Sequence, residues 1–161
     1  MNIIRITPDN WEKFRTIRLA ALNSDPQAFG AEVGDEAERK EPEWRKRLAS
    51  PDRFFFAVEE GDVYASIAGA RLIEEKTWML LAVHTLPESR GKGFAQALVD
   101  RVIEEARSRG ADTIQLSVNI DQENAVHVYK KAGFEVIRTI KDEKMRDGKL
   151  HDEYLMEKKL R

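Results

Sequence analysis

The feature that most limits the fold of this sequence is an amphipathic helical segment that lies between two strand-like segments. The segment before it, residues 78–85, is apolar and β-like, and the segment after it, residues 113–118, alternates apolar residues on one face. Gly110 supplies a stop for the helix. A helix that joins two strands in this way is typical of a β-α-β unit. Its expected buried face consists of apolar residues at three- and four-residue spacing: Ala95, Leu98, Val99, Val102, Ile103 and Ala106.

Signals of further helices and strands flank this unit. Thr7-Pro8 supplies an N-cap and a proline at the first helical position, which predicts a helix to about Asn23. A shorter helix is expected around Trp44, and Asp121 is expected to cap another that ends at Gly133. The order β-α-α-β-β-β-α-β-α-β-β predicts one α+β domain over residues 1–161, a mixed sheet flanked by helices. The remaining strands are expected at residues 2–6, 54–58, 63–73, 134–145 and 150–160.

Composition excludes several classes of function. The chain has 27 Lys and Arg against 29 Asp and Glu, a net charge of -2, which disfavours nonspecific binding to nucleic acid. Its apolar runs are far shorter than a membrane span, and the first ten residues lack the pattern of a signal peptide, so we expect a cytoplasmic protein without membrane contact. Cysteine is absent, which excludes disulfides and a thiolate nucleophile. The isolated histidines, His84, His127 and His151, predict no metal site.

The candidate chemistry lies at the start of the central helix, in residues 88–95. The first turn of a helix has unpaired N–H groups and the positive end of the helix dipole, so it suits a pyrophosphate. Gly91 and Gly93 let the backbone approach such a group, and Arg90 and Lys92 add positive charge. A flexible, capped turn is the structural alternative. The spacing fits neither a Walker A loop nor a dinucleotide fingerprint, because Gln96 stands where the third glycine belongs.

What remains is the pattern R-x-x-G-x-A, formed by Arg90, Gly93 and Ala95. This pattern resembles the [QR]-x-x-G-x-[GA] signature of the GNAT acyltransferase superfamily, whose loop holds the pyrophosphate of acetyl-coenzyme A (acetyl-CoA). The later family motif N-x-x-A-x-x-x-Y-x-x-x-G-F is matched in part, and the looser resemblance covers nearly the whole chain. The family asparagine is Gln122 here, so the pantetheine contact is expected from Gln122, Asn119 or Asn124. The matching positions are Ala125, Tyr129, Gly133 and Phe134.

The resemblance implies a GNAT-like, mostly antiparallel sheet of about seven strands with about four helices, and an N-acetyltransferase. Such an enzyme moves an acetyl group from acetyl-CoA directly to a primary amine of a small molecule or peptide and releases coenzyme A. Tyr129 would be the general acid, since a phenol with a pKa near 10 is protonated at neutral pH and can donate to the departing thiolate. The resemblance implies cofactor contacts from Val83, His84, Thr85, Arg90, Gly91, Lys92, Gly93, Phe94, Ala95, Gln96, Asn119, Gln122 and Tyr129.

Several alternatives remain at the level of sequence. A non-catalytic acyl-CoA-binding regulatory module is compatible with Gln122 and with the absence of an evident base, and a protein for another phosphate ligand is the third hypothesis. Ser117 stands where the branch that acetylates protein N-termini tends to carry glutamate, which disfavours that branch.

Acidic residues between 32 and 41 could attract a cationic amine such as a polyamine, aminoglycoside or lysine. Exposed strands could pair edge to edge in a homodimer, as often happens in the resembled family. Candidate bases are His84, Glu32, Glu36, Asp152 and Tyr154.

Overall fold

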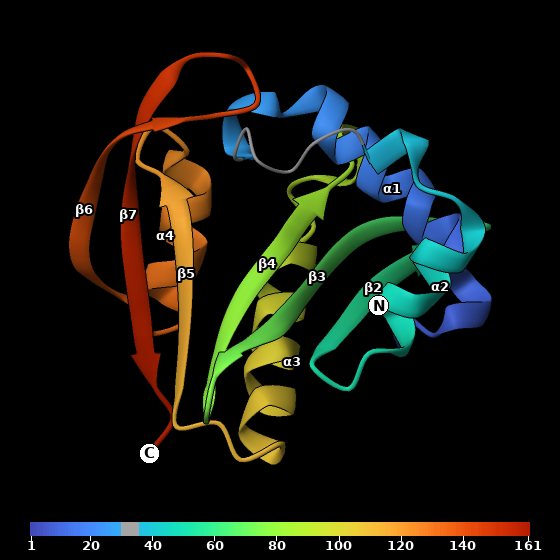
Figure 1. The fold of residues 1–161 in the computed structure, drawn as a ribbon, viewed down its shortest axis with the longest axis horizontal. Helices are drawn as coiled ribbons and strands as arrows, with labels where there is room; N and C mark the ends of the chain where they lie inside the picture. Colours follow the sequence, from blue (N-terminus) through green and yellow to red (C-terminus); the bar gives the residue numbers. More distant parts are fainter. Residues whose placement is uncertain (30–35) are drawn as a thin grey trace.

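A single seven-stranded sheet organises the molecule. The structure is a computed structural model and describes residues 1–29 and 36–161. The strand order is β1-β2-β3-β4-β5-β7-β6, and all neighbours are antiparallel except β4 and β5 (Figure 1). The strands are β1 (Ile3–Arg5), β2 (Arg53–Glu60), β3 (Val63–Glu74), β4 (Thr77–Thr85), β5 (Thr113–Asn119), β6 (Glu135–Lys144) and β7 (Leu150–Lys159). The α-helices are α1 (Trp11–Ser24), α2 (Glu41–Ala49), α3 (Phe94–Ser108) and α4 (Glu123–Lys131).

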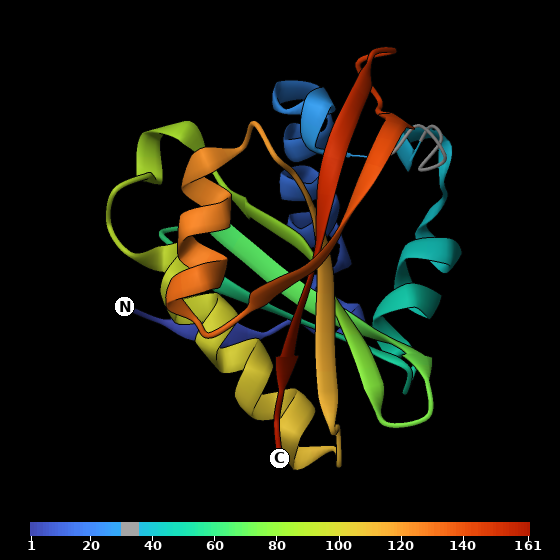
Figure 2. The same ribbon diagram turned by 90° about the vertical axis from the view of Figure 1, so that its left-hand side faces the viewer.

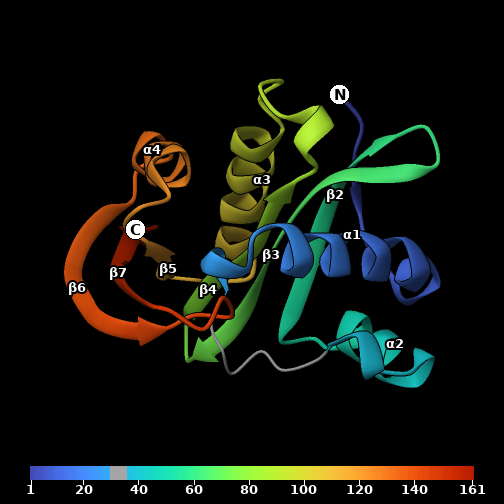
Figure 3. The ribbon, with the colours of Figure 1, turned by 90° about the horizontal axis from the view of Figure 1, so that it is seen from above.

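The helices cover opposite faces of the sheet. Helices α3 and α4 lie on one face, whereas α1 and α2 lie on the other (Figures 2 and 3). Strand β2 contributes side chains to the cores on both faces of the sheet. Phe54 and Phe56 belong to the core under α3, whereas Phe55 and Ala57 belong to the core under α1. A strand covered on both faces is continuously apolar rather than alternating. The α+β class and the order of elements predicted from the sequence are confirmed.

Strands β4 and β5 run together for only part of their length. Their parallel pairing joins Thr77–Met79 to Thr113–Gln115, although β4 continues to Thr85 and β5 to Asn119. Within β4 the register against β3 shifts next to Ala82, whose φ of 58° is rare for a residue with a side chain. Beyond the paired residues the two strands diverge, as Figure 1 shows. The sheet is therefore open between β4 and β5 at the end from which α3 departs.

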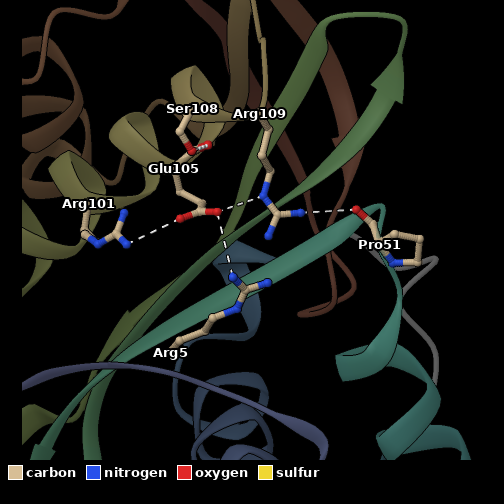
Figure 4. Close-up of polar contacts among 6 residues, drawn as sticks. All are labelled: Arg5, Pro51, Arg101, Glu105, Ser108 and Arg109. Carbon is tan, nitrogen blue, oxygen red and sulfur yellow. Dashed lines mark hydrogen bonds and ion pairs between the residues drawn. The ribbon is translucent and has the colours of Figure 1, made fainter.

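A charged cluster fixes α3 against β2 and the N-terminal strand. The Glu105 carboxylate accepts from Arg109 Nε at 2.9 Å and from Arg101 at 3.3 Å, and it lies 3.9 Å from Arg5 (Figure 4). Arg109 also donates to the carbonyl of Pro51 and lies over the Phe54 ring. Burial alone would raise the pKa of Glu105, but Arg109, Arg101 and Arg5 hold it below its usual value. The cluster therefore anchors the helix whose N-terminus faces the open end of the sheet.

Two expectations about helix starts need correction. Thr7 caps a short 3-10 turn, Pro8–Asn10, through a capping box with Asn10, and α1 begins only at Trp11. Asp121 does not cap α4, because the N-cap is Gln122 and that residue makes no side-chain cap. The reason is that the Asn119 side chain accepts the Asp121 N–H at 2.9 Å, so the chain turns one residue later than the pattern predicts. Among the helices of the described residues, none is long and apolar enough to cross a membrane.

Candidate active site

The turn between β4 and α3 exposes backbone donors. It passes through a short 3-10 turn, Pro87–Ser89, and through Gly91 and Gly93, whose φ values are 82° and 81°. A side chain is strained at such φ values, and glycine is not. Gly93 is the N-cap of α3 and leaves the first turn without a side-chain cap, while the space beside both glycines is open. Unpaired N–H groups and the helix dipole make this end of α3 suitable for an anionic oxygen group.

The cations of the turn are held by ion pairs. Lys92 Nζ lies 3.0 Å from the Glu60 carboxylate, which also accepts from the Ser89 hydroxyl at 2.7 Å. Arg90 donates to the Thr85 carbonyl at 3.1 Å and to the Asp25 carboxylate at 3.1 Å. These contacts tie the turn to the end of β4, to β2 and to the C-terminal end of α1. Donors left for a ligand in the turn are therefore chiefly backbone N–H groups.

His84 lies on the α1 face of β4 and is buried. Its Nδ1 is 3.3 Å from the Asp25 carboxylate that also binds Arg90. Burial is the main cause that lowers the pKa of His84, and the nearby Arg90 and Arg18 lower it further, whereas Asp25 raises it. The pKa therefore lies below its usual value, and the ring is neutral at pH 7. Within the described residues the buried Nε2 has no hydrogen-bond partner. The ring thus joins β4 to α1, and its free nitrogen lies beneath the surface.

Tyr129 lies on α4 and faces the core under α3. Its ring packs edge-on against Phe134, with centroids 6.2 Å apart, and Val83 of β4 packs against the same apolar cluster. Burial raises the pKa of Tyr129 well above the ordinary value of a phenol. The hydroxyl is therefore protonated throughout the neutral range, on the same face of the sheet as Val83.

The two amides that the sequence singles out differ in their contacts. Asn119 is 1% exposed, and its side chain donates to the Gln27 carbonyl at 3.0 Å and accepts from the Asp121 N–H. Both ends of this carboxamide therefore hold the start of α4 and the segment after α1. Gln122 is half-buried at the N-terminus of α4, and its side chain does not cap the helix. Asn124 is exposed on the same helix.

A cavity of about 330 Å³ on the α1 and α2 face was missed by sequence reasoning. It reaches Leu81 and Ala82, at the bulge of β4, and Glu36 lies in its wall at 2% exposure. Its arginines belong to α1, to the segment before α2, to α2, to β2 and to β3, so no single local motif marks the cavity. The lining consists of Phe14, Arg18, Glu36, Arg39, Arg47, Arg53, Phe55, Arg71, Leu81 and Ala82.

The candidate bases occupy different environments. Glu36 accepts from Arg18 at 3.0 Å and from Arg47 at 2.9 Å. Burial alone would raise the pKa of Glu36, but these two guanidinium groups hold it below its usual value. Asp152 accepts from Lys141 and from the Asp142 N–H in the β6–β7 hairpin. Tyr154 lies half-buried on β7, whereas Glu32 lies outside the described residues.

Comparisons with known proteins complete this description. The family model described as "Acetyltransferase (GNAT) family" matches residues 11–134. A curated acetyltransferase of Pectobacterium atrosepticum is 31% identical over 96 residues, which are 60% of this chain and 67% of that protein. A curated acetyltransferase of Sodalis glossinidius is 34% identical over 92 residues, which are 57% of this chain and 63% of that protein. The chain therefore spans 63% to 67% of the length of these two relatives.

Solved structures share the fold. A ribosomal-protein-alanine N-acetyltransferase from Brucella melitensis superimposes with a TM-score of 0.85 at 19% identity, over 99% of this chain and 100% of that one. An acetyltransferase from Salmonella typhimurium, solved with acetyl-CoA, superimposes with a TM-score of 0.83 at 18% identity, over 100% of this chain and 94% of that one. At these identities the likeness shows the architecture alone.

Proposed function

This chain belongs to the GNAT acetyltransferase family and is an acetyl-CoA-dependent enzyme, and from that premise we propose that it acetylates a primary amine of a small molecule or peptide by direct transfer. The observation that carries the proposal is the open end between β4 and β5. It lies between the uncapped N-terminus of α3 and the protonated Tyr129 on α4. The non-catalytic module considered from the sequence gains no support from these features.

Residues of the turn fit the pyrophosphate of acetyl-CoA. Gly91 and Gly93 leave open space where other residues would place a Cβ, and the first-turn N–H groups of Phe94, Ala95 and Gln96 are available. Arg90 and Lys92 contribute positive charge from within their ion pairs. The diverging edge of β4, at Val83, His84 and Thr85, would hold the extended arm of the molecule, and Gln122 or Asn119 would contact it from the other side of the opening.

Tyr129 would act as the general acid. When bound, acetyl-CoA supplies an acetyl group activated as a thioester. As the amine nitrogen bonds to the carbonyl carbon and the carbon–sulfur bond breaks, the Tyr129 hydroxyl would give its proton to the departing sulfur. The proton lost by the amine passes to a base or to water. Because burial raises the pKa of Tyr129, the hydroxyl keeps its proton at neutral and mildly alkaline pH, where part of the amine is neutral.

Three coarser expectations remain proposals alongside this chemistry. We expect residues 1–161 to act as one domain and to work in the cytoplasm. A homodimer would use an exposed edge of the sheet, and β6 is such an edge, with Val136 and Ile137 exposed. Analytical ultracentrifugation of the purified chain would test the last expectation, since a monomer at micromolar concentration contradicts it.

Replacement of the Tyr129 hydroxyl tests the proposal. Tyr129→Phe should lower kcat by about 10²-fold or more, because a positioned acid contributes roughly 10²–10⁴-fold, and should leave the Kd for acetyl-CoA unchanged. Release of free coenzyme A by thiol detection gives kcat, and calorimetry gives the Kd. Tyr64→Phe is the matched control, since Tyr64 is buried, its hydroxyl has no partner among the described residues, and burial raises its pKa to about 12. Unchanged kcat in Tyr129→Phe would remove the assigned role, and binding without release on any amine would contradict the transferase.

A further inference from the structure

The cavity on the α1 and α2 face carries a surplus of positive charge. Of the residues that the structure describes, five arginines and one glutamate line it, a surplus of four positive charges. Glu36 is already shared between Arg18 and Arg47. Among residues 1–29 and 36–161, no carboxylate lies within ion-pair distance of the three other lining arginines, Arg39, Arg53 and Arg71.

This arrangement is costly for the protein without a ligand. Burial lowers the pKa of Arg53 most, and repulsion from the neighbouring guanidinium groups lowers it further: those of Arg47, Arg71 and Arg39. Glu36 raises this pKa, but the net shift is downward. Like charges held together destabilise a fold unless a counter-charge is present. Guanidinium groups present several N–H donors in a plane, and this geometry matches the oxygen atoms of carboxylates and phosphates. The cavity therefore has the chemistry of a site for an anionic oxygen group.

The cavity also lies next to the proposed reaction centre. Its floor includes Leu81 and Ala82 of β4, and Ala82 directly precedes the Val83–Thr85 segment at which we place the thioester arm. Tyr129 and the α3 N-terminus belong to the opposite face of the sheet. An acceptor in the cavity would thus approach the open end between β4 and β5 from the face opposite to acetyl-CoA.

We propose that this arginine cavity binds a carboxylate or phosphate group of the acceptor, so that the substrate is a small amine that carries an anionic oxygen group. This inference rests on the proposed transferase function and narrows its substrate class. A volume of about 330 Å³ is at the lower end for ligand pockets, which fits a small acceptor. Arg53 and Arg71 are the specificity-determining residues, because Arg18 and Arg47 are engaged by Glu36. The surplus positive charge also favours the neutral form of the bound amine, which is the form that reacts.

Matched acceptors test the proposal. Coenzyme A release is measured with amines that differ only in the anionic group: amino acids against their amides, and ethanolamine phosphate against ethanolamine, with spermidine as a cationic amine. We expect kcat/KM to be at least tenfold higher for the anionic member of at least one pair. Preference within the first pair assigns the group as a carboxylate, and within the second as a phosphate. Equal or better turnover of the amides, ethanolamine and spermidine would overturn the inference while leaving the transferase intact.

Variants separate the cavity from the rest of the site. Arg53→Gln and Arg71→Gln should raise KM for the preferred acceptor by roughly tenfold to a hundredfold, with the Kd for acetyl-CoA unchanged. Arg107→Gln, on the exposed last turn of α3, is the control and should change neither value. A second readout does not depend on turnover: the preferred acceptor should raise the melting temperature of the wild-type chain and not of Arg53→Gln. If both variants keep the wild-type KM and the thermal shift, the cavity does not bind the acceptor.

Discussion

Glu36→Gln removes the only carboxylate from the described lining of the arginine cavity and therefore tests how much this charge stabilises the fold. The Glu36 side chain is 2% exposed and bonds Arg47 at 2.9 Å and Arg18 at 3.0 Å. Loss of one partner from a buried ion pair costs about 3–5 kcal/mol, because the remaining charge stays buried and unpaired. Arg18 and Arg47 are 12% and 13% exposed, so water relieves part of that cost. We expect a loss of about 3 kcal/mol in the free energy of unfolding.

The measurement is thermal unfolding followed by circular dichroism. For a domain of this size, 1 kcal/mol shifts Tm by about 2–4 °C, so Glu36→Gln should melt about 6–12 °C lower at pH 7. Glu41→Gln is the control, since its pair with Arg45 is exposed on α2 and should contribute nothing measurable. Because the folded-state pKa of Glu36 lies below the ordinary 4.5, its contribution is complete above that pH and is lost as the pH falls through the lower folded value. A Tm difference below 2 °C at pH 7, or one that persists undiminished at the acid end of the titration, would refute this reasoning.

Two further variants test the turn and the α3 anchor. Gly93→Ala should weaken acetyl-CoA binding by about tenfold in calorimetry, since the φ of 81° is strained for alanine and the Cβ would enter the space proposed for the pyrophosphate. Gly110→Ala, with a φ of 85° at the other end of α3, should bear similar strain without changing the Kd. Equal losses of affinity in the two variants would contradict the placement of the phosphate. Glu105→Gln should lower the free energy of unfolding in urea by about 1–2 kcal/mol, because three arginines lose their shared carboxylate. Glu104→Gln is the control and should not change this free energy, since Glu104 is exposed. Equal effects of the two variants would contradict a stabilising role for the cluster.

The fold was predictable because its signals are local. The spacing of apolar residues in 94–108 marks α3, and Gly110 marks its end, so one short window of sequence specifies a helix with a buried face. Asp147-Gly148 likewise marks the β6–β7 turn, where Gly148 has a φ of 80°. The expected helix starts at Pro8 and Asp121 were misplaced by one to three residues because local turns precede both helices. Thr7 caps the 3-10 turn Pro8–Asn10 before α1, and the Asn119 side chain accepts the Asp121 N–H before α4.

The backbone of the turn between β4 and α3 was predictable for the same reason, whereas the contacts of its side chains were not. Gly93 is the glycine of the R-x-x-G-x-A pattern, and both Gly93 and the neighbouring Gly91 have positive φ, which glycine adopts without strain. The partners of Arg90 and Lys92 are Asp25 and Glu60, which are 65 and 32 residues away in sequence. No pattern within the motif distinguishes a cation that is free for a ligand from one that already holds the turn.

The charge of the arginine cavity depends on the topology of the fold and could not be predicted from composition. The acidic residues between 32 and 41 suggest a site for cations, and the net charge of -2 gives no hint of a basic cavity. In the fold, Glu36 turns inward, where Arg18 and Arg47 neutralise it. Strands β2 and β3 then add Arg53 and Arg71, which β-sheet pairing places directly opposite each other. These two arginines are 18 residues apart in the sequence and become neighbours only through the β2–β3 register. The cavity beside Glu36 is therefore positively charged, although the acidic residues between 32 and 41 predict a negatively charged site.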